Sequence, residues 1–171
     1  MSIWWSVHLR REAASVPLAR RLLLGTMETA GVDPDICYDL SVALSEACAN
    51  AVEHGGRGGC PGAASREGPG EGPGERGGEG RDAATEAYHV TAYLDGDRCR
   101  IEVTDSGPGF PPSTVARRRP SGSCLAEHGR GLHLIEELAD HVRFRNRPGR
   151  GAVVSFDKML KWRDDALLKV S

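Results

Sequence analysis

The 171-residue sequence predicts an α+β fold, a two-layer α/β sandwich with a mixed, mainly antiparallel sheet and helices on one of its faces. Three observations lead to this prediction. Two helical patterns follow one another in the first third of the chain, four short alternating runs occupy the second half, and short turns join those runs in pairs. Strands that pair through short turns, with helices gathered elsewhere, are typical of an antiparallel or mixed sheet with one covered face.

The first elements are a strand and two helices. In residues 3–9 the apolar side chains fall on alternate positions, which predicts a half-buried strand. A helical pattern then covers about 15–30 and ends at Gly31. The next helix begins with Asp33 as its N-cap and Pro34 at its first helical position, because Asp accepts from free helix N–H groups and Pro lacks one.

The segment after the second helix differs sharply in composition. Residues 55–80 hold more than half of the 22 glycines of the chain. Such a segment cannot bury enough apolar surface to offset its ordering entropy, so we predict a disordered insertion over about 55–86. Neither flank looks complete alone, and residues 1–171 are therefore predicted to form a single domain; the alternative is a linker between two domains.

The second half of the sequence predicts four strands and one helix. In order, these are strands at 88–94 and 98–105, a helix at about 130–139, and strands at 141–146 and 151–156. The sequences Asp95-Gly96-Asp97 and Arg147-Pro148-Gly149-Arg150, which join the members of each strand pair, are typical of hairpin turns. A short polar helix is expected to close the chain.

Charge and cysteine content narrow the class of protein. The formal net charge of -2 gives no indication of nucleic-acid binding. The five cysteines are odd in number and contain no C-x-x-C pair, which indicates reduced thiols rather than disulfides or a zinc site. No apolar run is long enough for a signal peptide or a membrane span, so we expect a cytoplasmic protein.

The second helix carries a polar ridge beside its apolar stripe. At about 100° per residue, Glu46, Asn50 and His54 share one line along the helix, roughly 90° from the apolar line. This position is the margin of the core, where a cleft can open. A carboxylate and an amide on adjacent turns suit a magnesium phosphate site, since hard oxygens hold the ion and the carboxylate takes a proton. The alternative is a solvated helix face with this spacing by chance.

Asp105 follows a predicted strand and continues the parity of its apolar residues Ile101 and Val103. Its carboxylate should therefore point toward the covered face, where an unpaired Asp is costly. The exocyclic amino group of adenine would be a suitable donor, because an ionised carboxylate only accepts. Gly107 and Gly109 would let the backbone pass close to a flat base. The alternative is a Gly/Pro turn with a capping Asp.

A glycine pair, Gly129 and Gly131, immediately precedes the predicted helix at 130–139. A flexible pair at a helix N-terminus presents free backbone N–H groups to an anion such as phosphate. A lone G-x-G before a helix is common, so this stretch alone does not predict a site.

Together, and in this order, the three stretches resemble the GHKL ATPase superfamily, whose domains have the Bergerat-type fold. Within it they are most similar to the small anti-sigma-factor serine/threonine kinases and related bacterial ATP-binding regulators. SEACANAVEHG (45–55) resembles the N-box, DSGPGF (105–110) the G1 box and HGRGLHLI (128–135) the G2 box. The resemblance covers most of residues 3–156 apart from the insertion. It is more specific for adenine nucleotide binding than for kinase activity.

The resemblance implies ATP and Mg²⁺ as ligands. It implies that Asn50 coordinates magnesium bridging the phosphates, that Glu46 activates the attacking hydroxyl or water, and that Asp105 binds the adenine amino group. The remaining nucleotide-binding residues that it implies are Gly107, Gly109, Gly129, Arg130, Gly131 and Leu132. His54 matches the family pattern and is assigned only to packing or hydrogen bonding behind the site.

Two further features follow from the resemblance. Residues 111–128 would form the ATP lid, in which the arginines at 117–119 either meet phosphates or form an exposed basic loop. Ala152 stands after Gly151, where many relatives carry a threonine near the adenine, and this departure would weaken or rearrange one contact.

The leading hypothesis is an ATP-dependent serine/threonine protein kinase that acts as an anti-sigma regulator and phosphorylates a small antagonist protein, without direct contact to nucleic acid or membrane. The alternative is an ATP/ADP-binding module that switches partner affinity without phosphotransfer. A sensor histidine kinase is disfavoured, because the chain before the N-box is too short for a phosphoacceptor helical hairpin. The resemblance also implies a homodimer, to which Trp4 would contribute if exposed.

Overall fold

The strands of the protein form one five-stranded antiparallel sheet. A computed structural model describes residues 2–55, 86–107, 109–110, 128–147, 151–164 and 166. Its elements are, in chain order, β1 (Ser2–Arg10), α1 (Ser15–Ala30), α2 (Pro34–His54), β2 (Ala87–Asp95), β3 (Arg98–Thr104), α4 (His128–Leu138), β4 (His141–Arg147) and β5 (Gly151–Met159). The strand order is β1-β2-β3-β5-β4, and all four neighbouring pairs are antiparallel.

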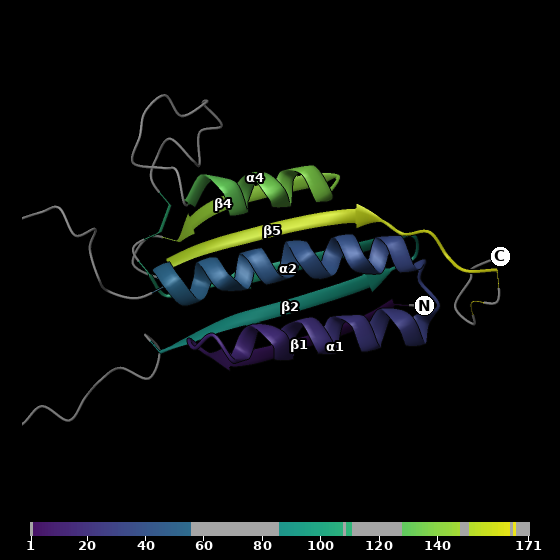
Figure 1. Ribbon diagram of the computed structural model, residues 1–171, viewed down its shortest axis with the longest axis horizontal. Coiled ribbons are helices and arrows are strands. Elements are labelled where there is room, and N and C mark those ends of the chain that lie inside the picture. The colour runs from purple at the N-terminus through teal and green to yellow at the C-terminus, as the bar shows by residue number, and fades with distance from the viewer. Residues whose placement is uncertain are drawn as a thin grey trace, which may run out of the picture.

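The three helices of the described residues lie side by side over one face of this sheet, with α2 in the middle (Figure 1). Helix α2 packs against α1 on one side and α4 on the other. The predicted two-layer α+β sandwich is therefore confirmed. Within the described residues the sheet is antiparallel throughout rather than mixed. A short turn between two strands, such as the one at Gly96 between β2 and β3, makes them run in opposite directions.

The sheet has a covered and an open face, and alternation along β1 separates them as predicted. Ile3 and Trp5 are half-buried against the core, whereas Trp4 points the other way and is 66% exposed. Trp4 lies opposite Tyr93 of β2, which is 43% exposed. The open face thus carries an aromatic cross-strand pair in contact with solvent.

The predicted end of α1 and the predicted start of α2 are confirmed. Gly31 adopts the left-handed conformation at φ 88°, and its N–H bonds to the carbonyl oxygens of Met27 and Glu28, which closes α1. Asp33 is the N-cap of α2, and its Oδ1 accepts from the backbone N–H of Asp35 at 2.9 Å. Pro34 occupies the first turn, where its missing N–H costs nothing.

Three cysteines lie in the core as free thiols. Burial raises the pKa of Cys37 to about 11 and the pKa of Cys48 and of Cys99 to about 12. A thiol with such a pKa is a poor nucleophile and metal ligand at neutral pH, so these cysteines act as small apolar side chains. Cys60 and Cys124 lie outside the described residues.

Several predicted features also lie outside the described part of the chain. These are the interior of the insertion predicted at 55–86, all but the last residue of the lid predicted at 111–128, with its arginines at 117–119, and most of the predicted C-terminal helix. The single-domain organisation remains a prediction. None of the described helices is both long enough and apolar enough to cross a lipid bilayer.

Candidate functional site

The polar ridge of α2 faces the start of α4. Glu46, Asn50 and His54 are half-buried, at the edge of the core where the sequence places them. A side-chain carbon at position 131 of α4 would lie 2.8 Å from Glu46 Oε2 and 3.7 Å from both Asn50 Oδ1 and Asn50 Nδ2. A side chain at 131 would make the Glu46 carboxylate move, so the structure brings residues of the predicted N-box and G2 box together.

The start of α4 corrects one expectation. The helix begins at His128, two residues before the predicted start, so Gly129 and Gly131 lie inside its first turn rather than before it. The first four backbone N–H groups of a helix have no partner within the helix, so the N-terminal turn of α4 is the kind of place where an anion binds. In the same turn Arg130 is exposed and Leu132 is half-buried against the core.

Asn50 has an unused donor. Its Nδ2 is buried and has no hydrogen-bond partner among the residues that the structure describes. A buried polar group without a partner costs about 1–3 kcal/mol of stability, and a ligand that supplies an acceptor removes this cost. A phosphate oxygen is an acceptor of this kind.

The donor set around Asn50 fits magnesium only in the presence of phosphate. No group of three or more His, Cys, Asp or Glu side chains among the described residues could hold a metal ion. Mg²⁺ usually takes one or two protein oxygens and fills its octahedron with water and substrate phosphates. One amide oxygen from Asn50, with Glu46 nearby, therefore fits a magnesium–nucleotide complex and not a free ion.

Asp105 lies at the other end of the site, beneath the C-terminal end of α2. Its Oδ1 accepts from the backbone N–H of Gly107 at 2.8 Å and of Ala152 at 3.3 Å. Neither bond uses Oδ2, which can accept from a ligand. Burial raises the pKa of the Asp105 carboxyl above its ordinary value, and the two backbone hydrogen bonds only partly offset that effect.

The glycines around Asp105 make room for close backbone contacts. A side-chain carbon at Gly107 would lie 2.5 Å from the carbonyl oxygen of His54, and one at Gly55 would lie 3.0 Å from Asp105 Cβ. Gly151 has φ +96° and packs directly against the backbone of Asp105. The start of the turn after β3 therefore packs between the end of α2 and the start of β5.

Ala152 and Gly151 make backbone contacts with Asp105 that were not predicted from the sequence. Ala152 binds Asp105 through its main chain, since its N–H donates to the carboxylate and its carbonyl oxygen accepts from the Asp105 N–H at 3.0 Å. A main-chain contact does not depend on side-chain type and leaves no sequence signal. Gly151 was the only visible clue, because a glycine that opens a strand often marks a close backbone approach.

The His54 side chain lies near two carboxylates. Its Nε2 is 3.4 Å from the carboxylate of Glu53, and its charge is one of the smaller causes that lower the pKa of the Asp105 carboxyl. Its backbone carbonyl, in contrast, lies against Gly107. The predicted role of the His54 side chain in packing or hydrogen bonding behind the site remains a prediction.

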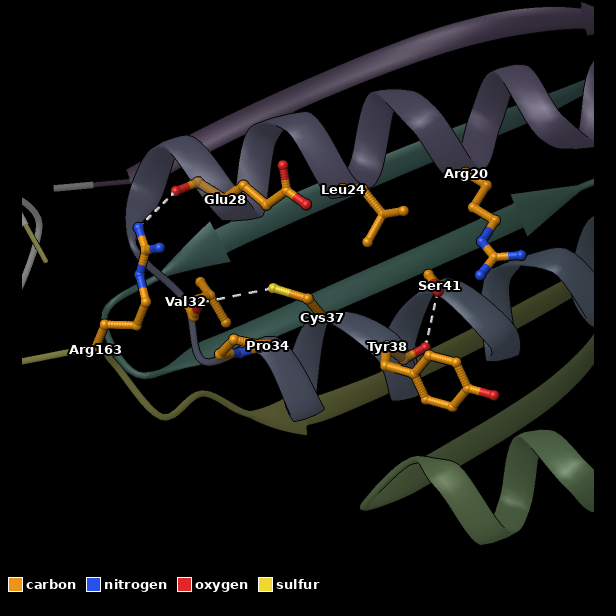
Figure 2. A pocket seen from close by; sticks show the side chains of 9 residues that line it. All are labelled: Arg20, Leu24, Glu28, Val32, Pro34, Cys37, Tyr38, Ser41 and Arg163. Carbon is orange, nitrogen blue, oxygen red and sulfur yellow. Dashed lines mark hydrogen bonds between the residues drawn. The ribbon is translucent and has the colours of Figure 1, made fainter.

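A separate hollow of about 330 Å³ lies at the opposite end of α2 (Figure 2). Its lining residues are Arg20, Leu24, Glu28, Val32, Pro34, Cys37, Tyr38, Ser41 and Arg163. The thiol of Cys37 points toward the carbonyl oxygen of Val32 at 3.7 Å, and Arg163 donates to the carbonyl oxygen of Glu28 at 3.2 Å. None of the predicted site residues lines this hollow, so it is distinct from the candidate site.

Comparison with known proteins gives results in agreement with this arrangement. The family model described as "Histidine kinase-like ATPase domain" matches residues 9–158. Serine-protein kinase RsbW of Bacillus subtilis is 32% identical over 137 residues, which cover 78% of this chain and 72% of that protein. Serine-protein kinase RsbW of Bacillus velezensis is 31% identical over 144 residues, or 81% of this chain and 75% of that protein.

A solved structure shows the same fold. The crystal structure of the RsbU and RsbW domains of Rv1364c from Mycobacterium tuberculosis superposes with a TM-score of 0.59 at 21% sequence identity. The match covers 92% of this chain and 32% of that longer polypeptide. Because the family model spans most of the chain and two relatives exceed 30% identity, the chain belongs to the family of histidine kinase-like ATPase domains.

Proposed function

We propose that the protein is an ATP-dependent serine/threonine protein kinase of the cytoplasm, which acts as an anti-sigma regulator by phosphorylating a small antagonist protein. The relatives named serine-protein kinase support the reaction class. The observation that carries the proposal is the approach of Gly131 to Glu46 and Asn50, because a carboxylate and an amide beside the N-terminal turn of a helix suit a magnesium–phosphate ligand.

Asp105 would bind the base. An ionised carboxylate accepts from the exocyclic amino group of adenine, and Asp105 Oδ2 is not engaged by the bonds to Gly107 and Ala152. Burial of this carboxylate makes it costly to leave without a donor, which favours a ligand that supplies one. The alanine at 152 still contributes its backbone N–H, so the missing threonine hydroxyl does not remove the contact to Asp105.

Asn50 and the first turn of α4 would bind the phosphates. Asn50 would hold Mg²⁺ through its side-chain oxygen, and the N–H groups of Gly129, Arg130 and Gly131 would face phosphate oxygens, while Leu132 packs this turn against the core. A bound magnesium ion neutralises phosphate charge and thereby favours transfer. Gly131 leaves room for the Glu46 carboxylate beside this turn, since a side chain at 131 would displace it.

Glu46 would act as the general base. Its carboxylate would take the proton of the attacking serine or threonine hydroxyl of the antagonist protein, while that hydroxyl oxygen bonds to the γ-phosphorus of ATP. The bond from the γ-phosphorus to the bridging oxygen breaks, and ADP leaves with the electron pair of that bond. Proton abstraction of this type typically contributes about 10²–10⁴-fold to a rate.

Substitution of Glu46 tests the assignment. With ³²P-labelled ATP and a candidate antagonist protein, we expect Glu46→Ala to lower phosphoprotein formation by at least about 100-fold while ADP affinity stays within about threefold. Glu136→Ala, which removes an exposed carboxylate of α4, is the matched control and should transfer like the wild type. Wild-type transfer by Glu46→Ala would remove the base assignment.

A regulatory ATP/ADP-binding module that does not transfer phosphate is the second candidate. It is favoured by the balance of contacts, since Asp105, Asn50 and the first turn of α4 all bear on nucleotide binding and Glu46 alone bears on transfer. Labelled phosphoprotein formed from ATP with any antagonist candidate would eliminate this alternative.

A homodimer completes the proposal, and the open sheet face offers one surface for it. Trp4 and Tyr93 are exposed and lie opposite each other on β1 and β2. Aromatic residues of this kind are enriched at protein interfaces. Sedimentation of the purified chain as a monomer at all accessible concentrations would contradict this part of the proposal.

A further inference from the structure

The turn that follows β3 is tied at both ends to one rung of the sheet. At its start, the Asp105 N–H donates to the carbonyl oxygen of Ala152 at 3.0 Å. At its end, the Phe110 N–H donates to Asn146 Oδ1 at 2.7 Å, and Asn146 Nδ2 donates to the Phe110 carbonyl oxygen at 2.8 Å. Asn146 and Ala152 are paired residues of β4 and β5. A single cross-strand pair therefore fixes both ends of the turn.

Asn146 binds Phe110 as a strand backbone would. A side-chain amide has the same donor and acceptor as a peptide group, and here both serve the backbone of one residue. The contact is reinforced by the ring of Phe110, which meets Phe144 edge to face with centroids 5.4 Å apart. Gly109 has φ +87°, and a side-chain carbon there would lie 2.7 Å from Asn146 Oδ1. Glycine at 109 is thus required for Asn146 to reach Phe110.

The middle of the turn orients Asp105. The Gly107 N–H donates to Asp105 Oδ1, and the Gly107 backbone is pressed against the carbonyl oxygen of His54. With Phe110 released, the part of the turn that contains Gly107 would be held at one end only. Its N–H would then sample more directions, and the carboxylate would lose one of the two bonds that fix its orientation.

We propose that Asn146 is a positioning residue for the base end of the nucleotide site: it holds Phe110, and through the turn it fixes the direction in which Asp105 presents its carboxylate to the 6-amino group of adenine. This inference rests on the proposed binding of an adenine nucleotide. Both polar atoms of the Asn146 amide serve the Phe110 backbone, so Asn146 acts on the base through Asp105.

Selectivity between two nucleotides separates this role from a structural one. ADP carries the 6-amino group, whereas IDP carries a carbonyl oxygen in its place and cannot donate to Asp105 from that position. We expect calorimetry to show that the wild type prefers ADP. Asn146→Ala should weaken ADP binding by about 10-fold and IDP binding by less than about twofold, on the scale of one or two hydrogen bonds. A loss of folding would weaken both nucleotides equally.

Two further variants sharpen the test. Arg145→Ala changes the neighbouring exposed residue of β4 and should keep the wild-type ratio of ADP to IDP affinity. Gly109→Ala disturbs the same contact from the other side and should lower the ratio as Asn146→Ala does. A wild-type ratio in Asn146→Ala would overturn the inference and leave the proposed function intact. A wild type that fails to bind ADP would overturn the proposed function, and the inference with it.

Discussion

The two halves of α2, which we call the leucine half (34–44) and the alanine half (45–54), bury side chains of very different volume. Leu40 and Leu44, in the N-terminal half, are 0% exposed, and Ala47 and Ala51, in the C-terminal half, are 1% and 2% exposed. The leucines fill the space between the helices and the sheet. The alanines fill less of that space, on the turns of the helix that carry Glu46 and Asn50. Most of the buried residues of α2 therefore lie in the leucine half, and the candidate site lies beside the half whose buried side chains are small.

The largest effect is expected in the leucine half. Leu40→Ala should lower the free energy of unfolding by about 2–5 kcal/mol, because it removes buried apolar contacts and leaves a cavity that the sheet and helices fill only partly. Urea denaturation measures the loss. Tyr38→Ala, at a position of the same half that is 62% exposed, is the matched control and should change stability by less than about 0.5 kcal/mol.

The same variant also tests whether the halves are separate. Under conditions in which Leu40→Ala is folded, added ADP and Mg²⁺ should raise its melting temperature as they raise that of the wild type. A stability loss together with a lost nucleotide response would mean that the leucine half also shapes the site.

The leucine half could be predicted from the sequence almost completely. Apolar spacing, the Asp33 cap and the Gly31 stop depend on local chemistry, so helix existence and helix ends followed from residue types alone. Strand alternation predicted the covered face in the same way. What spacing did not give was the strand order, which places β5 between β3 and β4, because register across the sheet depends on contacts far apart in the chain.

The site half could be predicted only as residue types. The motifs pointed to Glu46 and Asn50, yet their approach to Gly131 depends on how α4 packs against α2. The backbone contact of Ala152 and the amide contact of Asn146 were not predicted, because main-chain bonds leave no side-chain pattern and a single Asn in a strand has many uses. The sequence thus predicts which residue types the candidate site contains, and packing determines how they are arranged.

Asp105, next to the end of the alanine half, should show the next largest effect. Burial raises the pKa of its carboxyl in the folded chain, so the folded state binds this proton more tightly than the unfolded state does. The stability that this group contributes is then greatest at low pH. It falls as pH rises from the ordinary Asp value of about 3.9 through the raised pKa of the folded state.

Asp105→Asn removes this pH dependence and keeps an oxygen for the Gly107 and Ala152 N–H groups. Without ligand, the variant should be at least as stable as the wild type at pH 7, and the difference should grow as pH rises from about 4. It should also lose the roughly 2.7 kcal/mol that ADP at 100 times its Kd gives the wild type. Urea denaturation across pH, with Asp95→Asn as an exposed control, measures both. A wild type that gains stability relative to the variant as pH rises would contradict the assignment.

Gly131→Ala should change stability least, and it tests most directly whether the candidate site depends on the approach of α4 to the alanine half of α2. In Gly131→Ala the added carbon would lie 2.8 Å from Glu46 Oε2, the far end of a flexible side chain that can move aside. The cost of that movement is partly offset by the better helix propensity of alanine, so the net change in stability should stay below about 1 kcal/mol. The displaced Glu46 carboxylate should nevertheless lower phosphotransfer.

Gly25→Ala in α1 provides the matched control, since nothing lies within 4 Å of the added carbon. This substitution should stabilise the protein by about 0.5–1 kcal/mol and leave phosphotransfer unchanged. Thermal unfolding and the labelled-ATP assay on both variants distinguish a helix effect from a site effect. If Gly131→Ala transfers phosphate like Gly25→Ala, the closeness of α4 to Glu46 has no role in phosphotransfer.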